Sequence, residues 1–262
     1  MTEDVPEDEA KTYDDRFLCF IDILGFSAYV MQHAENAKSV ISNVKKIHQT
    51  SKDKITNIHG GELELSVFSD SIIISTAACS HAEDNMSRLC DLAWSVNSIC
   101  IALLRAGFLT RGALVRGDLL HRDGTVLGPA LVRAYQLETH SAIFPRIIVQ
   151  KPARVLLEAS GTRWVIPAGD GPYFIHTLKD FEERAKASHT IGWAKFSTSE
   201  PFRYIRACRD IIAQLLEDSR ENHKHYSYNK WFAKYFDRYV TRFGPANEAG
   251  WISPIVESDE LT

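Results

Sequence analysis

One stretch near the N-terminus constrains the fold more than any other. Residues 17–23 read Phe-Leu-Cys-Phe-Ile-Asp-Ile, so a single carboxylate, Asp22, interrupts an otherwise apolar run. A run of this length and composition is typical of a strand that is buried on both faces. An ionised carboxylate at the end of such a strand is costly to bury without a partner. The run therefore predicts an interior strand that carries one acid of special interest.

A second acid separates two further apolar stretches. Residues 63–68 and 71–75 flank the pair Ser69-Asp70, which predicts a β-hairpin with Asp70 at its tip. Either aspartate alone is compatible with an ordinary turn or capping residue. A strand-end Asp beside a hairpin-tip Asp, however, places two carboxylates within reach of shared divalent cations, and Mg²⁺ and Mn²⁺ prefer oxygen ligands. We therefore expect Asp22 and Asp70 to converge on one metal site.

The remaining periodicity predicts an α+β fold. Helical spacing before residue 150 predicts helices at about 27–54, 83–105 and 128–138. Strand-like segments follow the hairpin at 109–121, 125–127 and 147–149. Later, only 200–220 and 227–242 are clearly helical. The order of elements favours a mixed, mainly antiparallel sheet with helices packed on one side, plus a helical C-terminal extension.

Charge and composition exclude several classes of protein. The formal net charge is −4, and residues 1–15 hold seven acids against one Lys. We expect this acidic segment to be a disordered tail. The rest of the chain lacks the basic excess of a nucleic-acid binder, and no apolar run approaches the roughly 20 residues of a membrane span. The five cysteines are scattered without a CxxC spacing, which favours a reducing, cytoplasmic location.

Three motifs resemble those of one enzyme family. Residues 20–26, Phe-Ile-Asp-Ile-Leu-Gly-Phe, resemble the first metal-binding motif of class III nucleotidyl cyclases. Asp70 lies where that family has its second metal-binding aspartate, and residues 128–138 resemble its glycine-initiated helix. The stretch 111–138 is most similar to the bacterial pyrimidine cyclases of the Pycsar antiphage system. The resemblance implies a cyclase catalytic domain at 16–150. Residues 151–262 would then be a C-terminal extension packed on that domain or at a dimer interface.

The resemblance also implies an activity. A cyclase of this kind converts UTP, or with less support CTP, into the 3′,5′-cyclic monophosphate and pyrophosphate, using two Mn²⁺ or Mg²⁺ ions. The product would act as a second messenger on a separate effector in antiphage defence. Because sites of this family form between two domains, a head-to-tail homodimer is expected. The metal ligands would be Asp22, Asp70 and the carbonyl of Ile23.

A glycine bend follows the first aspartate. Gly25 has no Cβ, so backbone amides there can approach an anion closely, and the helix that follows directs its positive end towards it. We therefore expect the β- and γ-phosphates of the substrate to be held by the backbone amides of Ile23, Leu24, Gly25 and Phe26.

Two departures from the family concern the base. Purine cyclases carry a base-reading Lys at the position of Ser66 and often an Asp at the position of Thr125. Losing both removes the usual partners of adenine, and an unmatched buried polar group costs about 1–3 kcal/mol. We therefore expect Ser66 and Thr125 to be substrate-binding residues of a site that disfavours ATP.

A third departure concerns catalysis. Val132 and Gln136 stand where the family has an Asn and a transition-state Arg. Arg133 on the same helix is the favoured replacement, and Arg111 and Arg116 on the preceding strand are alternatives.

Two other functions stay open. One is a catalytically silent nucleotide-binding or dimerisation module, and the other is a purine cyclase with a rearranged pocket. His223 and His225 flank Lys224 in a polar stretch that we expect to be a solvated loop.

Overall fold

The computed structural model describes residues 13–59, 62–243 and 253–256. Most of the predicted acidic tail, residues 1–12, lies outside these ranges. Asp14 and Asp15, which the sequence assigns to that tail, already belong to the first strand. The Asp15 carboxylate accepts hydrogen bonds from the guanidinium of Arg116 across the sheet.

The described strands form one mixed sheet in the order β2-β3-β1-β4-β6-β8-β7, with β5 paired to β4. All the paired strands are antiparallel except β4 and β6, which run parallel. The strands are β1 Asp14–Ile23, β2 Leu63–Phe68, β3 Ser71–Ala77, β4 Thr110–Arg122, β5 Thr125–Leu127, β6 Ile147–Val149, β7 Val165–Pro167 and β8 Tyr173–Ile175.

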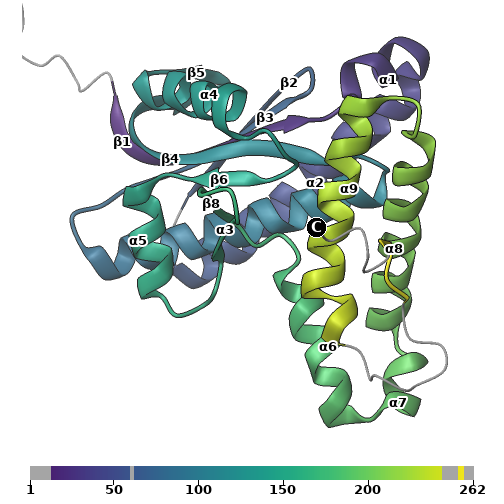
Figure 1. Ribbon diagram of the computed structural model, residues 1–262. Coiled ribbons are helices and arrows are strands. Elements are labelled where there is room, and N and C mark those ends of the chain that lie inside the picture. Colours follow the sequence, from purple (N-terminus) through teal and green to yellow (C-terminus); the bar gives the residue numbers. More distant parts are fainter. Residues whose placement is uncertain (1–12, 60–61, 244–252, 257–262) are drawn as a thin grey trace, which may run out of the picture.

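The helices lie on both faces of the sheet and at one of its ends (Figure 1). Their bounds are α1 Phe26–Gln32, α2 Ala34–His59, α3 Ala82–Arg105, α4 Pro129–Ser141, α5 Lys151–Ala159, α6 Lys179–Ile191, α7 Trp193–Ser197, α8 Glu200–Asp218 and α9 His223–Tyr239, followed by the 3₁₀ turn η1 Thr241–Phe243. Helices α6 to α9 gather beside the end of the sheet as a separate group (Figure 1).

Strand β1 packs against helices on both faces of the sheet. Phe17, Cys19 and Ile21 point into a core shared with α2 and α3, whereas Leu18 and Phe20 point into a smaller core under α4. All five side chains are buried. Fully burying a large apolar side chain contributes about 1.5–3 kcal/mol. The continuous apolar run is therefore explained by a strand with no solvent-facing side.

The predicted fold class is confirmed, with one change in the packing. The sheet is mixed and mainly antiparallel, and the C-terminal extension is helical. Helix α4, however, packs on the face opposite to α2 and α3, through Ala130 and Ala134. Small residues on this helix allow it to lie close to the strands, and its apolar stripe is too short to distinguish the two faces from sequence alone.

Two boundaries also differ from the prediction. Strands β7 and β8 join the same sheet, so the sheet extends past residue 150 and the helical extension begins with α6 at Lys179. The single long helix expected at 27–54 is divided into α1 and α2, with His33 ending α1 outside helical geometry.

Helix α3 is the one described helix that is long and apolar enough to cross a membrane, with a mean hydropathy of 1.2 in its most apolar window. That window is 61% buried, as in the core helix of a soluble protein. Length and composition are therefore weak evidence for a membrane span here.

Gly112 of β4 provides a test of the sheet register. A Cβ atom at this position would lie 2.0 Å from the carbonyl oxygen of Phe20 and 3.0 Å from Cδ1 of Ile147. We expect Gly112→Ala to lower the free energy of unfolding by about 1–3 kcal/mol or more, because the backbone must move. Urea denaturation measures this. Gly169→Ala, where a Cβ meets nothing within 4 Å, should be close to neutral. Equal stability of the two variants would contradict the tight approach.

Candidate active site

The two predicted aspartates lie at the same end of the sheet. Asp22 of β1 pairs in register with Ser71, the residue after Asp70. The N–H of Ile23 donates a hydrogen bond of 2.9 Å to the carbonyl of Asp70. Both aspartates line one pocket of ≈ 290 Å³. The strand end and the hairpin tip thus bring two carboxylates to one cavity, as the sequence predicts.

One oxygen of each carboxylate accepts a hydrogen bond, from a guanidinium at Asp22 and from a hydroxyl at Asp70. Arg111 pairs with Asp22 across β1 and β4, and its Nε donates to Oδ2 of Asp22 at 3.2 Å. The same Nε contacts the buried carboxylate of Glu138, which α4 supplies from the other face. Ser27 Oγ donates to Oδ2 of Asp70. These contacts leave Oδ1 of Asp22 and Oδ1 of Asp70 without a hydrogen bond from any described residue.

The surroundings of Asp22 oppose its negative charge in part. Burial raises the pKa of this carboxyl above its usual value, Arg111 lowers it, and the nearby Glu138 and Asp70 raise it further. A divalent cation beside Asp22 would favour the charged form. A positively charged ligand would therefore stabilise the ionised form of Asp22.

The donor set fits a Mg²⁺-type site that substrate completes. Among the residues that the structure describes there is no cluster of three or more His, Cys, Asp or Glu side chains able to hold a metal. Mg²⁺ is commonly held by one or two carboxylates together with waters and substrate phosphates, rather than by a full protein cage. Two carboxylates with free oxygens fit that pattern.

The glycine bend is present, but fewer amides are free than expected. Gly25 has φ 77°, in the left-handed region that favours glycine, and α1 begins immediately after it. The N–H groups of Ile23 and Leu24 already donate to the carbonyls of Asp70 and Leu109. They cannot also hold phosphates in this conformation. In the described chain, only the amides of Gly25 and Phe26 remain for that role. Helix α1 has just seven residues, so its dipole adds little.

The other predicted site residues lie away from this pocket. Arg133 donates from Nη1 to the carbonyl of Arg116 at 3.2 Å, on the α4 side of the sheet. Thr125 is exposed at the start of β5, paired with Arg122. Ser66 lies within β2. Of the candidate cations on β4 and α4, the structure brings Arg111 to the aspartates and leaves Arg133 outside.

Ser66 belongs to a buried polar network. Its Oγ lies 3.1 Å from Nε2 of His121, and Nδ1 of His121 lies 2.8 Å from Oγ of Ser75. Ser75 also accepts a hydrogen bond from Nε of Arg16. Burial, followed by the nearby charges of Arg16 and His48, lowers the pKa of His121 to about 4. The imidazole is therefore neutral at pH 7 and fixes the Ser66 hydroxyl.

Sequence reasoning missed the other wall of the pocket. Lys224, His225, Tyr228 and Asn229 of α9 line the same cavity as the two aspartates. The stretch expected to be a solvated loop, residues 223–225, is instead the first turn of this helix. Asp22 and Asp70 lie about 200 and about 150 residues before α9, and the intervening sequence carries no pattern that would have revealed the contact.

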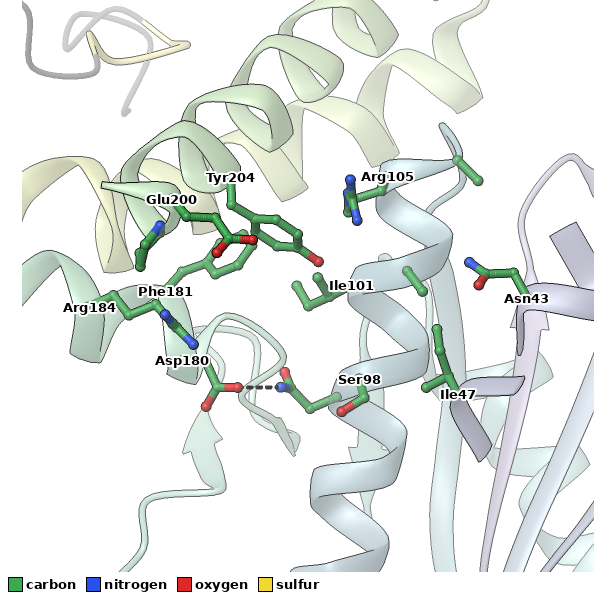
Figure 2. A pocket seen from close by; sticks show the side chains of 14 residues that line it. Asn43, Ile47, Ser98, Ile101, Arg105, Asp180, Phe181, Arg184, Glu200 and Tyr204 are labelled. Carbon is green, nitrogen blue, oxygen red and sulfur yellow. Dashed lines mark hydrogen bonds between the residues drawn. The ribbon is translucent and has the colours of Figure 1, made fainter. Parts of the chain in front are cut away.

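A larger cavity of ≈ 790 Å³ lies between α3 and the helical extension (Figure 2). Arg105 and Ile101 face it from α3, and Asp180, Arg184 and Tyr204 face it from the extension (Figure 2). None of the predicted site residues lines it. The donor set, rather than size, therefore identifies the smaller pocket as the candidate active site.

No protein-family model matches the sequence, and no curated protein matches it. The fold is similar to solved cyclase domains. A bacterial light-regulated adenylyl cyclase is 16% identical with a TM-score of 0.43, covering 63% of this chain and 91% of that one. The guanylyl cyclase domain of the RhoGC fusion protein from Blastocladiella emersonii is 14% identical with a TM-score of 0.41, covering 63% and 95%. The guanylate cyclase domain of RhGC from Catenaria anguillulae, solved with GTP, is 16% identical with a TM-score of 0.40, covering 62% and 96%. At these identities the similarity concerns the fold alone.

The His121 network predicts a dependence of stability on pH. The pKa of His121 is about 4 in the folded protein against 6.5 for an unperturbed imidazole, so the unfolded chain binds a proton first as the pH falls. The contribution is complete above about pH 6.5 and is lost between about pH 6.5 and 4. By pH 5 the loss is about 2 kcal/mol. Urea denaturation of His121→Gln from pH 7.5 to 5 should show a correspondingly shallower decline than the wild type. The exposed His81→Gln should retain the wild-type slope, and a wild-type slope in His121→Gln would overturn the assignment.

Proposed function

We propose that this protein is a nucleotidyl cyclase that converts a pyrimidine nucleoside triphosphate, UTP in preference to CTP, into its 3′,5′-cyclic monophosphate and pyrophosphate. The observation that carries the proposal is the convergence of Asp22 and Asp70 on one pocket, each with a carboxylate oxygen that accepts no hydrogen bond from a described residue. The product is a second messenger for a separate effector in antiphage defence, and the reaction takes place in the cytoplasm.

The reaction needs charge compensation and placement more than covalent chemistry. The ribose 3′-oxygen forms a bond to the α-phosphorus, the bond from that phosphorus to the bridging oxygen breaks, and pyrophosphate leaves while the hydroxyl proton passes to solvent. Asp22, Asp70 and the Ile23 carbonyl would hold two Mn²⁺ or Mg²⁺ ions. Such ions lower the pKa of a hydroxyl and neutralise phosphate charge.

Arg111 positions the first metal ligand. Its hydrogen bond fixes Oδ2 of Asp22, and its charge offsets part of the rise in the pKa of that carboxyl that burial causes. The amides of Gly25 and Phe26 are left to contact the phosphates at the bend.

A second copy of the chain completes the site. Ser66, Thr125 and Arg133 lie away from the aspartates of their own chain, so in a head-to-tail homodimer they serve the partner's pocket. Large apolar side chains that are more than half exposed occur on the same elements. They are Phe68 at the hairpin tip, Leu127 on β5, and Val132 and Tyr135 on α4. A partner chain would remove them from water.

The base choice rests on Ser66 and Thr125. Neither provides the long cationic donor or the carboxylate that reads adenine, and the Ser66 hydroxyl is fixed by neutral His121. Short hydroxyl donors and acceptors suit the carbonyl and N–H edge of uracil.

The rival is a silent nucleotide-binding module of the same fold. Val132 and Gln136 favour it, because they stand where a catalytic Asn and Arg are expected. Activity decides between the two.

The purified protein should convert UTP, with Mn²⁺ present, faster than CTP, ATP or GTP. Quantifying each cyclic product by chromatography after incubation with each of the four nucleotides measures this. Product from none of them would leave only the silent module, whereas a larger yield from ATP or GTP would indicate a purine cyclase.

Replacing either aspartate should strongly reduce turnover. Asp22→Asn and Asp70→Asn should each reduce the rate by about 100-fold or more and weaken Mn²⁺ binding, because each removes an anionic ligand. Calorimetric titration of Mn²⁺ in the presence of nucleotide gives the second readout. Asp53→Asn, on the exposed side of α2, is the matched control and should behave as the wild type. Full activity in either site variant would remove the metal assignment.

A further inference from the structure

We propose that Lys224 of the C-terminal helix α9 binds the β- and γ-phosphates of the substrate in its own chain, so that the extension is part of the active site. This inference rests on the proposed function, because it assigns a residue to the same triphosphate pocket. The part of the sequence that carries the family resemblance ends before α9.

The geometry places α9 opposite the metal ligands. Lys224 lies in the first turn of the helix and Tyr228 one turn further on, and both line the pocket that Asp22 and Asp70 line from the sheet. A triphosphate bound to metals on the two aspartates must therefore lie between the sheet end and this face of α9.

Charge balance identifies Lys224 as the cation available to the phosphates. Arg111 also lines the pocket, but its guanidinium already faces the carboxylates of Asp22 and Glu138. Lys224 has no carboxylate partner among the described residues, and its Nζ lies only over the Tyr228 ring, 6.0 Å from the centroid. Two divalent ions would not balance the combined negative charge of the triphosphate, Asp22 and Asp70, and Arg111 is already paired with carboxylates. An ammonium without a partner is therefore available for the phosphates furthest from the ribose.

Buried contacts hold α9 against the sheet. The hydroxyl of Tyr235, on α9, lies 2.7 Å from Nδ1 of His176, just after β8, and accepts a hydrogen bond from the N–H of Leu178. Trp231 stacks on Phe144, with ring centroids 5.5 Å apart. Because these groups tie α9 to the sheet, the position of Lys224 relative to the aspartates does not depend on a flexible loop.

Asn229 orients the same helix towards α8. Its Nδ2 donates to the carbonyl of Leu215 at 2.7 Å and to Oγ of Ser219 at 3.0 Å. These bonds fix the pocket-facing side of α9, so the lysine is presented from a rigid element.

The test compares Lys224→Ala and Lys224→Arg with Lys230→Ala, a change on the same helix outside the pocket. We expect Lys224→Ala to weaken binding of UTP and of pyrophosphate about tenfold or more, and to raise the KM for UTP more than it lowers kcat. Lys224→Arg should remain within about threefold of the wild type, because it keeps the charge. Lys230→Ala should match the wild type.

Binding is measured by calorimetry with Ca²⁺ in place of Mn²⁺, so that affinity is read without turnover, and circular dichroism confirms folding of each variant. Unchanged affinity in Lys224→Ala, with an active wild type, would overturn the role of Lys224 and leave the cyclase intact. Binding that depends on Lys224 without turnover of any nucleotide would remove the cyclase and keep the phosphate site. Absence of binding by the wild type would overturn both.

Discussion

The ion pair between Asp22 and Arg111 is the interaction on which the candidate site depends. A carboxylate at the end of a buried strand is costly unless a charge faces it, and β4 supplies that charge directly across the strand pair. This pairing exists in one register only, because a slip of one residue would send every side chain of β4 to the opposite face. The close approach at Gly112 and the two-sided burial of β1 keep that register fixed. The same contacts therefore stabilise the central sheet and position the charged groups of the candidate site at its end.

Much of the N-terminal part of the fold could be predicted from local pattern. The apolar run around Phe20 and the alternating residues of the hairpin are sufficient to identify β1, β2 and β3, because each segment carries its own period. Helices α3, α8 and α9 follow from their apolar stripes in the same way. The convergence of Asp22 and Asp70 was also predictable, since a hairpin paired with a neighbouring strand must bring its tip to that strand's end.

What the sequence did not reveal are relations between distant segments. The sequence favours Arg133 over Arg111 by its place on the helix, and it does not reveal that the pairing of β1 with β4 brings Arg111 to Asp22. The linear motif predicts that the amides of Ile23 and Leu24 are available to phosphates, whereas in the fold they donate to the carbonyls of Asp70 and Leu109. Helix α6 is polar in sequence. The burial of its Phe181 and Ala185 could not be predicted, because it depends on the helices that pack against them. No periodicity within α9 indicates that Lys224 faces residues on β1.

If the proposed function is correct, the pocket and the surface formed by β2, β5 and α4 have separate roles. The metal ligands, the glycine bend and α9 all belong to one chain, so the triphosphate can be bound within a single protomer. The residues proposed for the base and for the transition state lie on β2, β5 and α4, and a second chain would cover the apolar side chains exposed on those elements. Affinity for phosphate then comes from within the protomer, whereas base choice and turnover depend on dimerisation. Under this division the chain would bind a triphosphate without the Asn and Arg pair of the cyclases it resembles, because the groups proposed to bind the triphosphate do not include that pair.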